Sequence, residues 1–233
     1  MKAMSIVTGG SSGLGLALAE GLVAQGFNVA IIGRNDEKLT RASNFLMSRS
    51  DNATVIGFVG DVTDESFVQN TFSSIIAGGW EIKELFNCAG VGRFGRPEDN
   101  TKEIINIALG ASVVGTILMS TQALKVMKIS GGTIVNIMST AALKGSPNET
   151  VYCASKWGQK GYTEALRAYL KSSNIKVVGV YPGGMNTPFW SLECGESPDT
   201  SKFMNPSEVA EEILYAVRTR ESMYVSDIVI NKK

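Results

Sequence analysis

Two side chains in the second half of the chain could move a proton together. Tyr152 and Lys156 are four residues apart in a segment with helical spacing, so they would lie on one face of a helix, one turn apart. A phenol with a pKa of about 10 exchanges protons poorly at neutral pH, and a nearby ammonium group draws that pKa down. An ordinary amphipathic helix could carry the same pair by chance, so the interpretation depends on what accompanies it.

A glycine-rich stretch near the N-terminus could bind phosphate. Residues 8–15 read TGGSSGLG and lie between an apolar run and a helical pattern. Glycines let a strand turn sharply into a helix and let the backbone approach a pyrophosphate, to which the helix N-terminus offers free N–H groups. A tight turn without a ligand would need the same glycines. Nucleotide binding is favoured, because ligands bind at such turns in doubly wound sheets, and the expected contacts are Thr8, Gly9, Ser11, Ser12, Gly13, Leu14 and Gly15.

The elements that must position these residues alternate along the whole chain. Apolar runs rich in Val and Ile predict strands at 3–8, 28–32, 53–59, 84–88, 132–138, 175–181 and 223–230. Helical patterns lie between them at about 13–25, 36–49, 64–76, 101–128, 150–173 and 206–219. Most strands are continuous apolar runs, typical of a sheet covered on both faces. The sequence therefore predicts an α/β fold, a doubly wound Rossmann-type sheet of seven mostly parallel strands with helices on both faces, in a single domain over residues 1–233.

The glycine spacing TGxxxGxG differs from the commoner GxGxxG and resembles that of the short-chain dehydrogenase/reductase family in its compact form. The resemblance covers essentially the whole chain, and further motifs follow in the expected order. They are Asp61-Val62 after the third strand, NCAG at 87–90 (NNAG in the family), YCASK at 152–156 (YxxxK), and Pro182-Gly183 with Thr187 after the sixth strand. The resemblance implies cofactor contacts from Asp61, Val62, Asn87, Ala89, Gly90, Tyr152, Lys156, Pro182, Gly183 and Thr187.

The resemblance also implies a reaction, hydride transfer between a nicotinamide cofactor and a small carbonyl or alcohol. Ser139 precedes Tyr152 by 13 residues, the separation found in the family, and its hydroxyl can bond the oxygen on which charge develops. Ser139, Tyr152 and Lys156 are then the catalytic residues, with Tyr152 as the general acid or base. Ser112 stands where the family has an asparagine that anchors a relay water. The change is either tolerated or impairs proton delivery, and Asn106 is too far along the helix to substitute.

The end of the second predicted strand bears on the choice of cofactor. It reads Ile31-Ile32-Gly33-Arg34, with an arginine where an NAD-selective site usually has an acid. An arginine suits a 2′-phosphate, so NADP(H) is preferred and NAD(H) stays possible. An exposed arginine that opens the next helix would look the same.

The resemblance implies that a segment at about 186–205 covers the substrate. It contains Phe189, Trp190 and Leu192, and other apolar residues from loops (Phe94, Leu143 and Met185) are expected at the same crevice. These side chains favour an apolar or aromatic carbonyl or alcohol.

Composition excludes several other classes of function. The chain has no histidine, which rules out a Ser-His-Asp triad, and its three cysteines form no CxxC pair, so we expect no metal site. Equal numbers of basic and acidic residues, 22 of each, argue against nucleic acid as a partner. The odd cysteine count and the short apolar start favour the cytoplasm.

An uncharged stretch from 104 to 124 has the length of a membrane span. Its six polar residues and two glycines favour a helix packed on the sheet instead, with no membrane partner. The family commonly pairs this helix and the next across a two-fold axis, so a homodimer or homotetramer is expected.

Two alternatives remain for the function: a non-catalytic NADP-binding regulatory protein of the same fold, and a nucleotide-sugar epimerase or dehydratase. The latter usually has TGxxGxxG and a longer C-terminal part.

Overall fold

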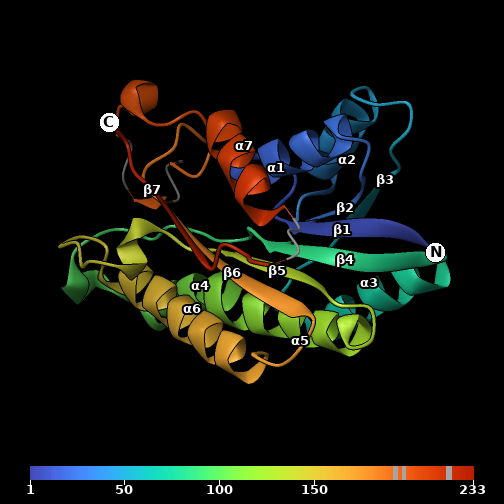
Figure 1. Ribbon diagram of the computed structural model, residues 1–233. Helices are drawn as coiled ribbons and strands as arrows, with labels where there is room; N and C mark the ends of the chain where they lie inside the picture. The colour runs from blue at the N-terminus through green and yellow to red at the C-terminus, as the bar shows by residue number, and fades with distance from the viewer. Residues whose placement is uncertain (191–193, 196–197, 219–221) are drawn as a thin grey trace.

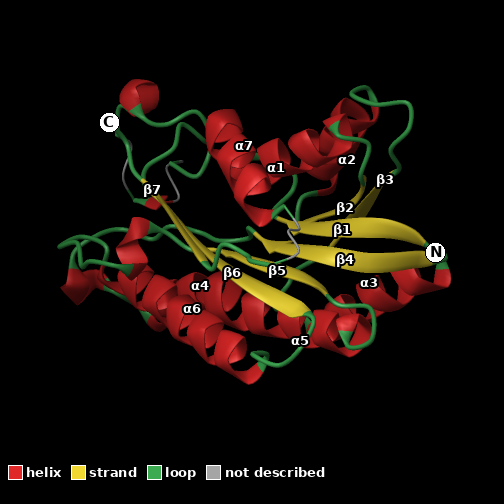
Figure 2. Cartoon of the chain, in the orientation of Figure 1, coloured by secondary structure: helices red, strands yellow, loops and turns green. Residues whose placement is uncertain are grey.

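A parallel sheet of seven strands runs through the centre of the computed structural model, which describes residues 1–190, 194–195, 198–218 and 222–233 (Figures 1 and 2). The strand order is β3-β2-β1-β4-β5-β6-β7, so the chain winds outwards from β1 in one direction and from β4 in the other. In such a sheet ligands bind where the two directions part, at the carboxyl ends of β1 and β4. The strands are β1 (Lys2–Thr8), β2 (Asn28–Gly33), β3 (Val55–Val59), β4 (Trp80–Asn87), β5 (Gly132–Ile137), β6 (Ile175–Pro182) and β7 (Asp227–Ile230).

Helices cover both faces of this sheet (Figure 2). One layer holds α1 (Gly13–Ala24), α2 (Asp36–Met47) and α7 (Pro206–Val217). The other holds α3 (Glu65–Ala77), α4 (Lys102–Leu109), α5 (Thr116–Met127) and α6 (Thr150–Tyr169). Four helices begin after residues whose side chains accept hydrogen bonds from the first free N–H groups: Asn35, Asp64, Thr101 and Asn205. The predicted fold class is confirmed.

Each strand contributes apolar side chains to both layers, which explains the continuous apolar runs. On β1, Met4 and Ile6 pack with Met119 and Leu166 of the α3–α6 layer. Val7 lies on the opposite face, among residues of α1 and α7 such as Leu18 and Ile213. Alternate residues therefore face two separate cores, and neither face of the sheet needs polar residues.

The long helix predicted at 101–128 is in fact three pieces. A π-helical turn at Gly110–Gly115 separates α4 from α5. Gly115 lies against the loop that precedes α3, and a Cβ on Gly115 would be 2.5 Å from Val62 Cγ2. The sequence does not reveal such a turn, because the uncharged run from 104 to 124 carries little periodic contrast in which a shift could be seen.

Several predicted boundaries were wrong. β4 begins at Trp80 rather than 84, because Gly79 with φ 81° ends the preceding turn and Trp80 pairs with Lys2. β7 is limited to four residues, since it pairs with β6 only from Asp227 to Ile230. The helices predicted to 49 and 173 end at Met47 and Tyr169.

The 26-residue helical stretch Lys102–Met127 is long and apolar enough to cross a membrane by length and composition alone. One side of it packs on the sheet, where Met119, Ala123 and Met127 are fully buried against β4 and β5. The prediction that this stretch packs on the sheet is confirmed. The other side is partly exposed, with Val114 45% exposed.

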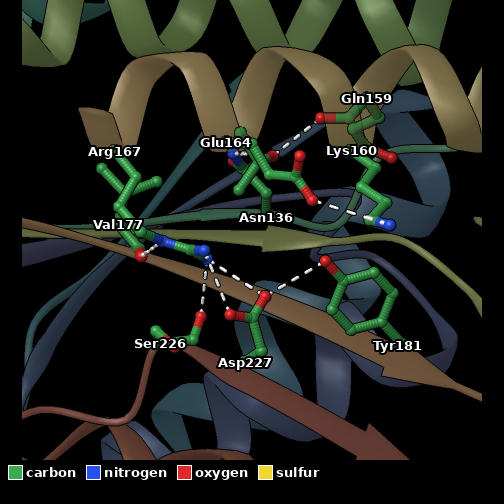
Figure 3. A network of polar contacts seen from close by, with 10 residues as sticks. Asn136, Gln159, Lys160, Glu164, Arg167, Val177, Tyr181, Ser226 and Asp227 are labelled. Carbon is green, nitrogen blue, oxygen red and sulfur yellow. Dashed lines mark hydrogen bonds and ion pairs between the residues drawn. The ribbon is translucent and has the colours of Figure 1, made fainter. Parts of the chain in front are cut away.

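The C-terminal strand β7 is tied to α6 by a polar network (Figure 3). The guanidinium of Arg167 donates to the backbone carbonyls of Val177 and Ser226 and pairs with Asp227 at 3.0 Å. The Tyr181 hydroxyl donates to the same carboxylate. One helix side chain thereby joins two neighbouring strands at the edge of the sheet.

Candidate active site

A cavity of about 1200 Å³ opens at the carboxyl ends of the strands, where β1 and β4 diverge. It extends from the glycine-rich loop and the end of β2, past β4 and β5, to α6 and the segment after β6. Most of the residues predicted for the site line it: Gly9, Ser11, Ser12, Gly13, Leu14, Gly15, Arg34, Asp61, Val62, Ala89, Gly90, Ser139, Tyr152, Lys156, Pro182, Gly183 and Thr187. The topology thus brings together residues up to 178 positions apart, from Gly9 to Thr187.

The glycine-rich loop has the backbone that a phosphate site needs. Gly9 has φ 66°, and a Cβ on it would lie 3.2 Å from the backbone of Ala89. A Cβ on Gly15 would collide with the carbonyl oxygen of Gly9. Ser12 precedes α1 with no side-chain cap in the described structure, so the first N–H groups of α1 are available to an anion in the cavity.

Two residues predicted to touch the cofactor lie behind the cavity wall. The Thr8 hydroxyl accepts hydrogen bonds from the N–H groups of Cys88 and Ala89, each at 3.0 Å. The Asn87 amide donates to Asn136 Oδ1 at 2.8 Å and to Ser120 Oγ at 3.2 Å. Both side chains are buried and hold the end of β4 in place. They shape the loop that lines the cavity.

Basic side chains stand at the end of the cavity near β2. Arg34 lies 3.8 Å from the Asp61 carboxylate, and the two side chains are 65% and 41% exposed. Lys38, one turn into α2, also lines this part of the wall. Sequence reasoning missed Lys38, because Arg34 precedes α2 and no helical spacing relates the two residues. Two cations facing one pocket end can pair with a phosphate group.

Ser139, Tyr152 and Lys156 meet on one wall of the cavity. Ser139 ends the segment after β5, and its hydroxyl accepts from the Ala141 N–H at 3.1 Å. Lys156 Nζ lies 5.9 Å from the centre of the Tyr152 ring. The ammonium donates to the Ile137 carbonyl at 3.2 Å and to Gln159 Oε1 at 2.9 Å. Gln159 was not anticipated, although its i+3 spacing places it beside Lys156 on the helix.

Burial shifts the pKa of both α6 residues away from the charged form. It raises the pKa of Tyr152 above its ordinary range, and a hydrogen bond with Ser139 acts in the opposite direction. Burial lowers the pKa of Lys156 to about 8. The expectation that the pKa of Tyr152 is lowered towards the working range was wrong for this structure, because burial outweighs any neighbouring charge: the apolar rings around the phenol remove the water that would solvate a phenolate. A neutral phenol can donate a proton to a carbonyl oxygen.

Ser112 is fully buried in the π-helical turn. Its hydroxyl makes no hydrogen bond within the part of the chain that the structure describes. It lies near Lys156, since a Cβ on Gly90 would be 3.4 Å from Lys156 Nζ and 3.7 Å from Ser112 Oγ. Asn106 is exposed at the cavity rim, as expected for a residue that does not replace the missing asparagine.

Aromatic rings form the far end of the cavity. Phe94 contacts the rings of Tyr152, Phe189 and Trp190, with centroids 5.3 to 6.1 Å apart. The indole of Trp190 donates to the Met185 carbonyl at 3.0 Å, which fixes its orientation. Leu143 was expected here, but it lies outside this wall and is 40% exposed. Leu192 lies outside the described residues.

The chemistry available to this site is proton donation, oxyanion binding and phosphate binding. Over residues 1–190, 194–195, 198–218 and 222–233, no three His, Cys, Asp or Glu side chains gather where they could hold a metal ion. The described residues therefore offer acid–base and electrostatic groups, with a phosphate cradle alongside.

Comparisons with known proteins give matches over nearly the whole chain. The family described as short chain dehydrogenase matches residues 3–193. Carbonyl reductase family member 4 of Xenopus laevis is 32% identical over 235 residues, which cover 99% of this chain and 96% of that protein. A short-chain dehydrogenase/reductase structure from Vibrio parahaemolyticus is 33% identical, with a TM-score of 0.86 over 99% of this chain and 96% of that one. The structure of actinorhodin polyketide ketoreductase with NADPH is 25% identical, with a TM-score of 0.87 over 99% and 95%.

Proposed function

The chain is an oxidoreductase of the short-chain dehydrogenase family, and we propose that it transfers hydride between NADP(H) and a small carbonyl or alcohol with Tyr152 as general acid or base. The observation that carries this proposal is the convergence of Ser139, Tyr152 and Lys156 on the cavity that begins at the glycine-rich loop. A phosphate cradle and a proton donor in one cavity fit a dinucleotide and a reacting carbonyl side by side.

The residues present fit NADP(H). The uncapped start of α1 suits the pyrophosphate, and Arg34 with Lys38 suits a 2′-phosphate. Val62 lies where the adenine would rest, and Pro182, Gly183 and Thr187 would border the nicotinamide, as the family resemblance implies. The cofactor, when bound, supplies the hydride. That the related ketoreductase structure holds NADPH supports the same choice.

In the reductive direction Tyr152 gives its phenolic proton to the carbonyl oxygen as that oxygen becomes negative. The Ser139 hydroxyl donates a hydrogen bond to the same oxygen and stabilises its developing charge. The buried ammonium of Lys156 stabilises the phenolate that remains, and it can also bond the ribose hydroxyls of the cofactor. Stabilisation of the phenolate requires Lys156 to be charged. Turnover should therefore fall as the pH rises past the Lys156 pKa of about 8.

The rings of Phe94, Phe189 and Trp190 favour an apolar or aromatic substrate. Tyr152 is only 7% exposed beneath them, so the carbonyl must reach it through a water-poor passage. Small ketones with flat or apolar substituents fit this wall, because ring faces pack on such groups without a loss of hydrogen bonds.

A spectrophotometric screen tests the proposal. Purified protein with NADPH, and separately with NADP⁺, is offered aromatic and aliphatic ketones or alcohols, and absorbance at the nicotinamide band is followed. Turnover of an apolar carbonyl that is lost in Tyr152→Phe would support the proposal. NADPH binding with no turnover of any compound would instead favour a non-catalytic role.

The remaining features are also proposals. One sheet carries both the phosphate cradle and the catalytic residues, so the whole chain would act as a single domain. Trp157 on α6 and Val114 beside α5 are 48% and 45% exposed, which suits pairing of this face with a second copy of the chain. Cys88, Cys153 and Cys194 form no disulfide in the structure, which suits the reducing cytoplasm.

A further inference from the structure

We propose that Gln159 is a positioning residue for the reaction, and that its side-chain carbonyl fixes the Lys156 ammonium in its charged, cavity-facing form. This inference rests on the proposed function for its catalytic consequence. The contact itself does not depend on it, because it joins two buried side chains of α6 that are three residues apart.

Two hydrogen bonds of the Lys156 ammonium determine where its third N–H group points. The side chain is only 4% exposed, and an ammonium group has three N–H donors. Two of them bond Gln159 Oε1 at 2.9 Å and the Ile137 carbonyl at 3.2 Å. The third is left for the cavity, which Lys156 lines beside Tyr152. Loss of either acceptor would let the ammonium rotate away from the reacting groups.

The orientation of the Gln159 amide follows from its neighbours. An ammonium can only donate, so the atom of Gln159 that faces Lys156 must be the carbonyl oxygen. The amide nitrogen donates to Thr116 Oγ1 at 2.9 Å. Gln159 is fully buried and Thr116 is 2% exposed, so water does not compete for either contact. Thr116 opens α5 directly after the π-helical turn, so that turn places the residue that holds the amide.

Among the described residues, Gln159 Oε1 is the side-chain acceptor of the Lys156 ammonium, beside the backbone carbonyl of Ile137. The other titratable groups that face the ammonium are Tyr152 on its own helix and Cys88 from the loop after β4. Burial raises the pKa of each, so both are neutral at pH 7. Ser112, at the position where the family has asparagine, leaves its hydroxyl without a hydrogen bond among the described residues. The Gln159 amide dipole is therefore the side-chain group that favours the charged lysine.

The direction in which the Lys156 pKa changes in two variants distinguishes this role from ordinary core packing. Gln159→Met keeps the volume and removes the acceptor, so the charged form of Lys156 loses support. Gln159→Glu keeps the shape and places a carboxylate there, which Thr116 can still contact through its hydroxyl. A structural role would make both variants less stable, whereas a positioning role moves the lysine pKa in opposite directions.

The direct test is a titration of ¹³Cε-lysine-labelled protein by NMR, with the Lys156 signal assigned from its loss in Lys156→Met. The Lys156 pKa should fall by about one pH unit in Gln159→Met and rise by about one in Gln159→Glu, the size expected for a hydrogen bond to a charged group. Thr163→Val is the matched control, because Thr163 is buried one turn further along and bonds the Gln159 backbone. It should leave the lysine pKa unchanged. Equal pKa values in Gln159→Met and Gln159→Glu would overturn the inference.

Kinetics give the second readout. With a wild-type pKa of about 8, kcat at pH 8 should fall about fivefold in Gln159→Met and rise about twofold in Gln159→Glu. If the wild type reduces no carbonyl but the lysine pKa moves as expected, the reductase proposal fails and the role of Gln159 in holding Lys156 stands. If the wild type turns over but the lysine pKa stays fixed in both variants, the Gln159 inference fails alone.

Discussion

Replacing Arg34 by aspartate should reverse the preference of the protein for NADPH over NADH. The guanidinium lies at the end of the cavity next to the loop after β2, where a 2′-phosphate would be bound. It is already held 3.8 Å from the Asp61 carboxylate. Aspartate at this position would remove one cation, place a second carboxylate beside Asp61 and offer an acceptor to the ribose 2′-hydroxyl of NADH.

The exposure of Arg34 sets the size of the effect. A hydrogen bond between charged groups contributes about 1.5–3 kcal/mol. The side chain is 65% exposed, so solvent screening brings the contact just below this range, to about 1.4 kcal/mol or tenfold in Kd. Repulsion of the 2′-phosphate by the new carboxylate should add a loss of similar size. NADPH affinity should therefore fall by about a hundredfold, while NADH affinity stays level or improves.

The assay is a fluorescence titration of both cofactors at low and moderate salt. Arg34→Met separates loss of attraction from added repulsion and should show about half the effect in free energy. Arg41→Asp is the control, because Arg41 lies on α2, the helix that follows Arg34, and pairs with Glu37 away from the cavity wall. Equal affinity of the wild type for NADPH and NADH, or an unchanged ratio in Arg34→Asp, would refute the reasoning.

Three further predictions concern other parts of the molecule. Tyr152→Phe should keep NADPH affinity and lose about 10²–10⁴-fold in kcat, because the ring still packs on Phe94 but has no proton to give; near-normal turnover would exclude Tyr152 as the acid. Partial burial acts to raise the pKa of Asp227, but hydrogen bonds from Ser226 and Arg167 outweigh it and the pKa lies below the ordinary 3.8. Its contribution to stability is therefore present above about pH 4 and lost as pH falls through the folded pKa. Asp227→Asn should cost about 1 kcal/mol in urea unfolding at pH 7 and progressively less as pH falls below about 4. Trp157→Glu should shift sedimentation towards monomer, and a wild type that is monomeric at micromolar concentration would remove the proposed pairing.

Much of the site could be predicted from the sequence because its chemistry is local. Tyr152 and Lys156 share a helix face through their spacing alone, and the glycines at 9 and 15 are required by backbone approach. The alternation of apolar runs and helical patterns predicted the parallel sheet. A strand that is buried on both faces is apolar at nearly every position, and such strands are typical of parallel sheets. The family resemblance, carried by several motifs in order, is confirmed by the match over residues 3–193.

Contacts between distant elements were decided only by the tertiary structure. Thr8 and Asn87 belong to the family motifs, but the sheet register places their side chains between strands, behind the cavity wall. The π-helical turn at 110–115 is stabilised by close packing against Val62 from another loop, which no helical period records. The environment of Lys156 likewise depends on Thr116 and Ile137, which lie on different elements. The types and spacing of side chains in the sequence indicate which groups can react. The protonation of these groups depends on desolvation and on hydrogen-bond partners from other elements, which only the tertiary structure brings together.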